Sequence, residues 1–256
     1  DEATGEMQAA GLFFLLEGID EATFQERKER LGWESMRFET EIAAAVENGE
    51  YPIPRRRLGL YKSCDGTWRA NVTRIPGVDG TRSEDLTRIA VEGRRQIAAA
   101  VRFLRKYVKG CERVRLRESA ALPGVRETRR IHGDFVLEEQ SLIDGEVFAD
   151  AILVCSNSRD NHFGLVGKYI PSTRSYTLPY RILLPRNADN LLAAGRNVSC
   201  TRPVLSAIRV MPPCFGMGQA AGNAAVLALE ESVPCSGIDT EELRRRLLAE
   251  NVVLSE

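Results

Sequence analysis

Three separate segments carry side chains suited to catalysis or substrate binding. Asp160 and His162 lie two residues apart in a polar loop, and a histidine that titrates near neutral pH can move a proton. Arg129 and Arg181 each offer a planar guanidinium that can pair with both oxygens of an anionic substrate. Ordinary interpretations stay open: the histidine could be a surface residue, Arg129 could lie on a solvated strand edge, and Arg181 could pair with an acid.

A glycine-rich segment, GMGQAAGNAA at residues 216–225, is predicted to open a helix that runs to about residue 230. Gly218, Gly222 and Ala225 fall three or four apart, so they share one face that is nearly bare of side chains. The start of such a helix would present backbone N–H groups and the positive end of a dipole to a phosphate or to the carbonyl edge of a flavin. The alternative is a small-faced helix that packs tightly on a sheet and binds no ligand.

The same segment formally contains a dinucleotide-binding pattern. Gly216, Gly218 and Ala221 fit G-x-G-x-x-G/A, but the pattern lacks the preceding strand and the following βαβ unit that the fingerprint requires. A phosphate-binding or nucleotide-binding protein of another kind is therefore only a weak third interpretation.

The elements that must position these residues alternate along the chain. Strands are predicted near residues 12–16, 57–63, 67–73, 114–121, 150–155 and 191–194, and helices near 21–31, 35–48 and 83–108 and from residue 240 onward. Asp65-Gly66 predicts a hairpin turn between the second and third strands. Residues 124–131 are expected to be extended, and residues 135–144 to form a strand and a short helix.

Composition limits the functional classes. The net charge of −1 disfavours a nucleic-acid partner held by phosphate contacts. The chain has only two histidines and no C-x-x-C pair, so we expect no metal site. Six scattered cysteines suit a reduced, cytoplasmic setting, and no apolar run is long enough to cross a membrane.

The segment from Asn190 to Gly222 reads NLLAAGRNVSCTR, then RVMPPC, then GQAAG. It resembles the C-terminal, flavin-closing segment of the FAD-dependent oxidoreductase family, and so many ordered matches make the resemblance specific. GVRETRRI at 124–131, the D-x-H of 160–162 and TLPYR at 177–181 resemble further family segments. Arg202 departs from the pattern, because the family usually has a histidine there.

The resemblance implies FAD as cofactor and an α+β fold. Residues 1–188 would form a mixed-sheet substrate domain, and 189–256 the last strand and helix of a split, glutathione-reductase-like FAD-binding domain. The implied reaction is hydride transfer between flavin and a small, anionic organic substrate. The implied cofactor-binding residues are Gly195 and Arg196 near the ribityl and pyrophosphate groups, Arg209 near the ring or substrate, and Gly218, Gln219, Ala220 and Ala221 at the flavin carbonyl edge. Arg129 and Arg181 would bind substrate, and His162 would transfer a proton.

The family begins with a Rossmann-type half, and nothing like its glycine motif appears before residue 189. The chain also starts at Asp1 without a methionine, so we expect it to be part of a longer polypeptide. A partner chain could supply the missing half. The alternative from another functional class is a catalytically inert fragment or subunit that acts as a structural or interaction module.

Overall fold

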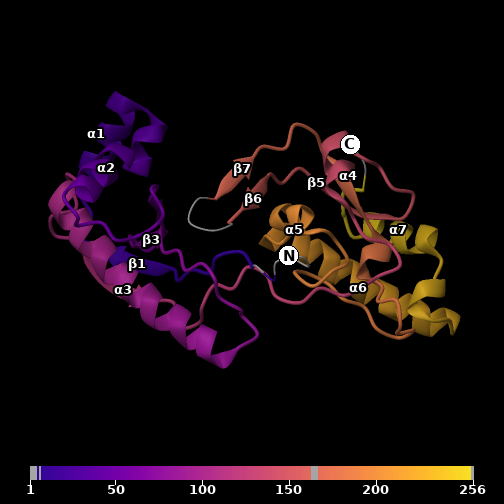
Figure 1. Cartoon of the computed structure of the whole chain (residues 1–256). Helices are drawn as coiled ribbons and strands as arrows, with labels where there is room; N and C mark the ends of the chain where they lie inside the picture. Colours follow the sequence, from indigo (N-terminus) through magenta and orange to yellow (C-terminus); the bar gives the residue numbers. More distant parts are fainter. Residues whose placement is uncertain (1–4, 6, 163–166, 255–256) are drawn as a thin grey trace. The chain divides into compact units, whose positions relative to one another are not determined.

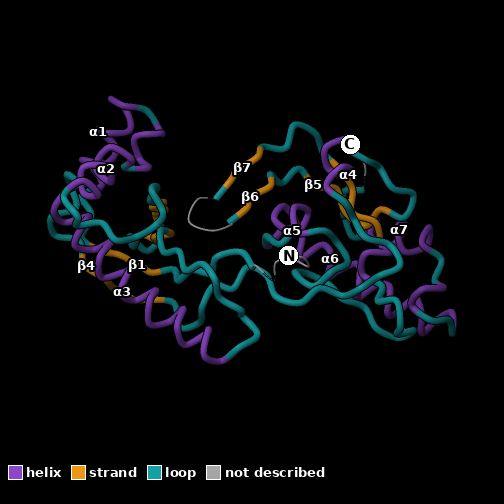
Figure 2. The backbone as a smooth tube through the Cα atoms, in the orientation of Figure 1, coloured by secondary structure: helices purple, strands orange, loops and turns teal. Residues whose placement is uncertain are grey.

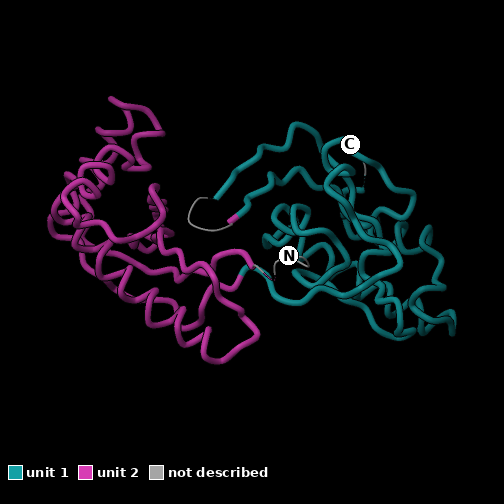
Figure 3. The backbone as a smooth tube through the Cα atoms, viewed as in Figure 1, with its two compact units in different colours: residues 1–4, 126–161, 167–256 teal, residues 5–125, 162–166 magenta. Residues whose placement is uncertain are grey.

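Figure 1 shows the computed structural model, which describes residues 5, 7–162 and 167–254. The chain forms two compact units, described here one at a time (Figure 3). Unit 2 consists of residues 5–125 and 162–166, and unit 1 of residues 1–4, 126–161 and 167–256. The boundaries of these units do not coincide with the predicted domain boundary between residues 188 and 189. That boundary refers to the domains of the family and stays a prediction.

Unit 2 is built on a four-stranded antiparallel sheet with the order β2-β3-β1-β4. Its strands are β1 (Phe14–Glu17), β2 (Gly59–Lys62), β3 (Trp68–Asn71) and β4 (Arg115–Ser119). The predicted hairpin is confirmed: Gly66 adopts a φ of 80° in the turn between β2 and β3, a conformation that glycine takes without strain.

The helices of unit 2 are α1 (Glu21–Leu31), η1 (Trp33–Arg37), α2 (Glu39–Glu47) and α3 (Ser83–Tyr107). Asp20 caps α1 by accepting hydrogen bonds from the backbone N–H groups of Ala22 and Thr23. The single helix predicted over 35–48 is wrong. Phe38 takes a left-handed φ of 56° and divides the segment into η1 and α2.

The core of unit 2 lies between the sheet and these helices. Phe24 packs against both Phe38 and Trp68, with ring centroids 5.6 and 5.4 Å apart. Gly93 lets α3 come close to the chain before β1, because a Cβ there would lie 2.9 Å from the Cβ of Leu12. The absence of a side chain at residue 93 therefore allows α3 to pack closely against Leu12.

Unit 1 contains two small antiparallel pairs. β5 (Ala151–Cys155) pairs with β8 (Tyr176–Pro179), and β6 (Arg159–Asn161) pairs with β7 (Lys168–Ile170). Together with the sheet of unit 2, these pairs confirm the α+β class: helices combine with antiparallel sheets.

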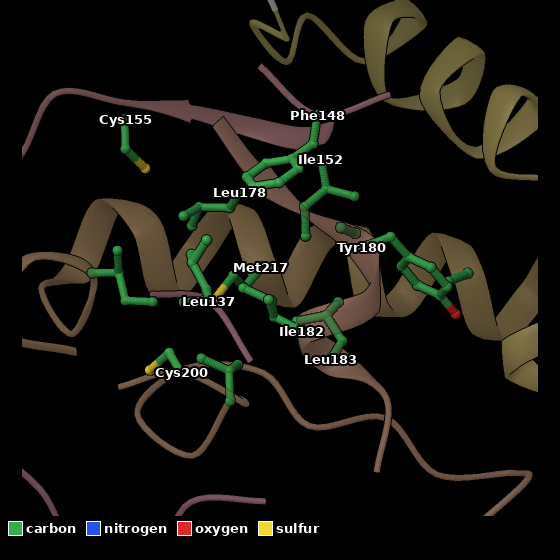
Figure 4. Close-up of a cluster of buried hydrophobic side chains, with 14 of the residues drawn as sticks. Leu137, Phe148, Ile152, Cys155, Leu178, Tyr180, Ile182, Leu183, Cys200 and Met217 are labelled. Atoms are coloured by element: carbon green, nitrogen blue, oxygen red, sulfur yellow. The ribbon is translucent and has the colours of Figure 1, made fainter. Parts of the chain in front are cut away.

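The helices of unit 1 are α4 (Glu139–Asp144), η2 (Tyr180–Leu183), α5 (Arg202–Ile208), α6 (Met211–Glu231), η3 (Cys235–Gly237) and α7 (Thr240–Ala249). One face of α6 forms the centre of the core. Met217 belongs to the same buried cluster as Ile152 of β5, Leu178 of β8 and Ile182 of η2 (Figure 4). Among the helices of the described residues, none combines the length and apolar character of a membrane span.

Two expectations for unit 1 are wrong. Residues 184–201, all of them described, form a loop with one isolated bridge rather than a strand at 191–194 (Figure 2). Leu191 is exposed there, and Ala193 is buried and donates to the carbonyl of Leu183 at 2.9 Å. In place of the strand predicted after residue 135, Leu137 forms a single parallel bridge with Cys200.

Candidate functional site

The helix α6 begins earlier than its sequence suggested. It starts at Met211, with Pro212 and Pro213 in its first turn, where a missing backbone N–H costs no helical hydrogen bond. Cys214 then donates to the carbonyl of Val210 at 3.2 Å. The predicted helix start at 216–218 is therefore wrong. Residues 218–221 lie inside the helix, where N–H groups donate to carbonyls four residues earlier.

What residues 218–221 provide instead is part of a helix face. Gly218 and Gly222 are exposed, and a Cβ added to either would meet no atom within 4 Å. Gln219 is also exposed, and its amide donates to Glu250 at 2.7 Å. Ala220 is fully buried in the core of unit 1, so its side chain serves packing, and Ala221 is half-buried beside it.

Large apolar side chains extend this open face. Met211 and Phe215 are each 70% exposed at the start of α6, and Leu229 is 81% exposed near its end. With Gly218 and Gly222 between them, they form a stripe that we call the open face of α6. A contiguous exposed apolar patch can mark an interaction surface.

Three of the predicted cofactor residues come together at the start of α6. Gly195 has a φ of 96°, and a Cβ there would lie 3.8 Å from the sulfur of Cys214. Burial raises the pKa of the Cys214 thiol, and the charges of Arg196 and Arg209 act in the opposite direction. Gly195, Arg196 and Arg209 therefore share the environment of one side chain, and their role in binding FAD stays a prediction.

Arg209 holds this cluster to strand β6. Its side chain is only 11% exposed, and Nη2 donates to the carbonyl of Asp160 at 3.0 Å. Burial lowers the pKa of Arg209, while the carboxylates of Asp160 and Glu127 oppose that change. Its Nε is buried and finds no hydrogen-bond acceptor within the described part of the chain. A buried donor without an acceptor is costly, so a ligand oxygen would be stabilising there.

A buried charge cluster lies on the neighbouring helix. Arg202, the first residue of α5, donates from Nε to Glu127 Oε1 at 3.0 Å, and Arg130 lies 3.8 Å from the other oxygen of that carboxylate. The Oγ1 of Thr201 is buried too, with no partner among the residues described. The sequence had indicated Arg202 only as a departure from the family pattern, and Glu127 was missed. The available signal was a single carboxylate inside the arginine-rich run RETRR.

The predicted substrate residue Arg181 is engaged within unit 1. Its Nη1 donates to Asp150 Oδ1 at 3.0 Å, and its backbone N–H donates to Asp150 Oδ2 at 3.2 Å. The guanidinium also lies over the rings of Phe135 and Phe148, 4.2 and 5.1 Å from their centroids. The acid-pairing interpretation therefore describes Arg181 in this structure, although part of the side chain remains exposed.

The other predicted catalytic residues are placed differently. Arg129 is exposed on unit 1. His162 belongs to unit 2 and is buried, with its carbonyl accepting from the N–H of Ala9 at 2.8 Å and its own N–H donating to Gln8 Oε1 at 3.4 Å. Asp160 belongs to unit 1, so the two residues of the D-x-H pattern belong to different units.

A sequence model of the FAD dependent oxidoreductase family matches residues 1–247. The chain belongs to this family. No curated protein and no solved structure matches it. Family membership implies oxidoreductase activity, FAD as cofactor and a small-molecule substrate. Within the described residues, no group of three or more His, Cys, Asp or Glu side chains could hold a metal ion.

The residues at the start of α6 fit FAD. Its pyrophosphate is anionic and its ring carbonyls are acceptors, so both complement Arg196, Arg209 and the unpartnered Nε of Arg209. The bare surface at Gly218 and Gly222 leaves room for a planar ring or a second backbone.

Proposed function

We propose that this chain forms the substrate-binding and flavin-closing part of a FAD-dependent oxidoreductase that transfers hydride between flavin and a small anionic substrate. One observation carries the proposal: Gly195, Arg196 and Arg209 gather at the start of α6 around Cys214. The orphaned Nε of Arg209 adds a donor that is already buried and ready for an acceptor. The split, glutathione-reductase-like arrangement of the FAD-binding domain is part of this proposal.

The roles of the cofactor-binding residues follow from their chemistry. Gly195 lets a ligand approach the backbone, because it has no side chain and adopts a φ that other residues avoid. Arg196 and Arg209 neutralise anionic or electron-rich groups of the cofactor. Gly218 and Gln219 contribute to the wall of the site, and Ala220 and Ala221 fix the helix that carries them. When bound, FAD supplies the two-electron chemistry by accepting or donating hydride at N5.

The anionic substrate class rests on arginines. Arg129 is exposed and free of steric cover, and Arg181 keeps an exposed part although Asp150 holds one edge of its fork. Either guanidinium can pair with a substrate carboxylate, and His162 is the proposed proton carrier. The six cysteines are free thiols, which supports a reduced, cytoplasmic setting for the reaction.

The open face of α6 supports a partner for the chain. Phe215 and Leu229 would be covered if a Rossmann-type half, on a partner chain or on a longer polypeptide, packed against this helix. The two glycines would let a second helix or strand approach closely. The same face also serves the alternative, in which the chain is a catalytically inert module that only docks to a partner.

The test is titration of the purified chain with FAD, followed by visible absorbance and flavin fluorescence. We expect a protein-shifted flavin band, and we expect Arg209→Gln to weaken binding by about tenfold or more, because a charged donor is lost. Arg245→Gln is the matched control, since Arg245 is an exposed arginine on α7. Equal affinity of both variants would contradict the assignment of Arg209. A colourless chain that ignores FAD would favour the inert module.

A further inference from the structure

Unit 2 contains a surface cavity of about 680 Å³, largely open to solvent, that none of the proposed flavin residues lines. One wall is a single face of α3, from Glu84 to Gln96, where lining residues recur every three or four positions. The other wall comes from Pro52, Pro54 and the segment from Arg74 to Pro76. Its volume lies in the range of small-molecule sites, roughly 300–1,000 Å³.

Part of the lining is apolar and stiff. Pro52, Pro54 and Pro76 each have a fixed φ, so this wall loses little conformational freedom when a ligand binds. Val91 faces them from α3, and its side chain is 47% exposed. A ligand that enters the cavity therefore meets proline rings on one side and the side chain of Val91 on the other.

The polar part of the lining is held in place by a buried amide. Gln96 accepts from the backbone N–H of Arg74 at 2.8 Å and donates to its carbonyl at 3.0 Å. Both residues are about 5% exposed. This double hydrogen bond fixes Arg74 to α3 before any ligand arrives, which is how pre-organised sites limit their binding cost.

Charge in the lining favours a monoanion. The lining holds three arginines, Arg74, Arg88 and Arg95, and two carboxylates, Glu84 and Glu92. Arg88 is already engaged, because it donates to the carbonyls of Pro76 and Gly77 and lies 3.9 Å from Asp85. Arg95 is therefore the arginine placed to meet a single anionic group. Arg95 is exposed, and its Nη1 lies 3.8 Å from a carboxylate oxygen of Glu92. The two carboxylates would repel a phosphate dianion, whereas a carboxylate matches the planar fork of arginine.

We propose that this cavity binds a small organic carboxylate with an apolar body. The carboxylate pairs with Arg95 of α3, and the apolar body lies against the prolines and Val91. All the lining residues belong to unit 2, and the residues assigned to FAD belong to unit 1. Binding at this site therefore does not depend on the flavin assignment.

The experiment uses 4-phenylbutyrate as probe and 4-phenylbutyramide as its uncharged match, with binding measured by calorimetry and by ligand-observed NMR. We expect saturable binding of the acid and affinity for the amide lower by about tenfold or more, because the charged pairing is absent. Val91→Trp fills the cavity from an exposed position and should abolish binding. Arg102→Trp, on the same helix but outside the lining, should leave binding unchanged.

Arg95→Gln supplies a second test that leaves the cavity open. It should weaken binding of the acid and leave binding of the amide unchanged, since only the acid carries the charge that Arg95 meets. Equal binding of acid and amide, unchanged binding in Val91→Trp, or no saturable binding of the acid would each overturn the proposal.

Discussion

Nε of Arg202 lies 3.0 Å from Oε1 of Glu127, and both side chains are almost fully buried in unit 1. The sequence separates these residues by 75 positions, so the pair joins the extended segment after residue 125 to the start of α5. Arg130 lies 3.8 Å from the second oxygen of the same carboxylate. One buried acid thus neutralises charge from two arginines beside the candidate flavin site.

Removing that carboxylate charge should destabilise unit 1. Glu127→Gln keeps the shape of the side chain but leaves the buried guanidinium of Arg202 without its counter-charge, which costs about 3–5 kcal/mol in comparable buried pairs. Urea unfolding followed by circular dichroism measures the loss. Glu230→Gln is the matched control, because Glu230 pairs with Arg246 at the surface and should change stability by less than about 1 kcal/mol. Similar losses in both variants would contradict a structural role for the buried pair.

The open face of α6 predicts opposite effects on stability and on binding. Gly218→Ala and Gly222→Ala should each stabilise the chain by about 0.5–1 kcal/mol, because alanine favours helix and its Cβ meets no neighbour. The same changes should weaken FAD binding or partner docking if that face is covered in the active protein. Thermal unfolding and FAD titration of the same variants give both values.

Gly216→Ala is the internal control on the same helix. A Cβ at residue 216 would lie 2.7 Å from Cδ2 of Leu153, so that side chain must shift and the helix-forming gain should shrink or disappear. A gain at residue 216 as large as those at 218 and 222 would show that contact with Leu153 does not limit the packing of α6.

Arg181 should matter for stability through its geometry and not only its charge. Arg181→Lys keeps the positive charge but loses the fork that meets Asp150 and the flat surface over Phe135, so we expect a loss of about 1–2 kcal/mol. Arg186→Lys offers a comparison, since Arg186 pairs with an exposed Asp134 and should change stability very little. Unfolding by denaturant measures both. A stable Arg181→Lys variant that has lost substrate affinity would instead favour the substrate-binding role.

Buried thiols should make the protein less stable in alkali. Burial raises the pKa of Cys111, Cys155 and Cys200 to about 12, from an ordinary value of 9.0. Above pH 9 the unfolded chain loses these protons while the folded chain keeps them, so stability falls as pH rises towards 12, by at most about 1.4 kcal/mol per thiol and pH unit. The free energy of unfolding at about pH 8 and about pH 10 measures the slope, and Cys155→Ala should reduce it. An unchanged slope in that variant would contradict the burial of this thiol.

Local signals predicted the elements that local chemistry controls. Helix α1 has the predicted bounds because Asp20 caps its start and Gly32 ends it. Helix α2 was predicted too long because the helical segment is interrupted at Phe38. This residue has a left-handed φ and is buried in the core of unit 2, and the spacing of residues in the sequence reveals neither property. Pro203 and Pro212 lie in the first turns of α5 and α6, where a helix tolerates proline.

The candidate site shows the same difference between what local sequence signals predict and what long-range contacts decide. Gly195, Arg196 and Arg209 could be proposed from the sequence because an ordered motif carries them. The partners of Arg181 and Arg202 could not be predicted, since Asp150 and Glu127 are distant in sequence and only folding brings them near. Whether a predicted arginine holds a substrate or an internal acid depends on such long-range contacts.

The final residues of the described chain determine when each unit can take shape during synthesis. The carbonyl of Val253 accepts from the N–H of Val154 in β5, and Leu254 is buried in the core of unit 1. All four strands of the unit 2 sheet, in contrast, have been translated by residue 119. On the ribosome, the sheet of unit 2 can therefore form before the last core residue of unit 1 has been translated. A nascent chain that stalls before residue 254 would expose the apolar centre of unit 1 to chaperones and proteases.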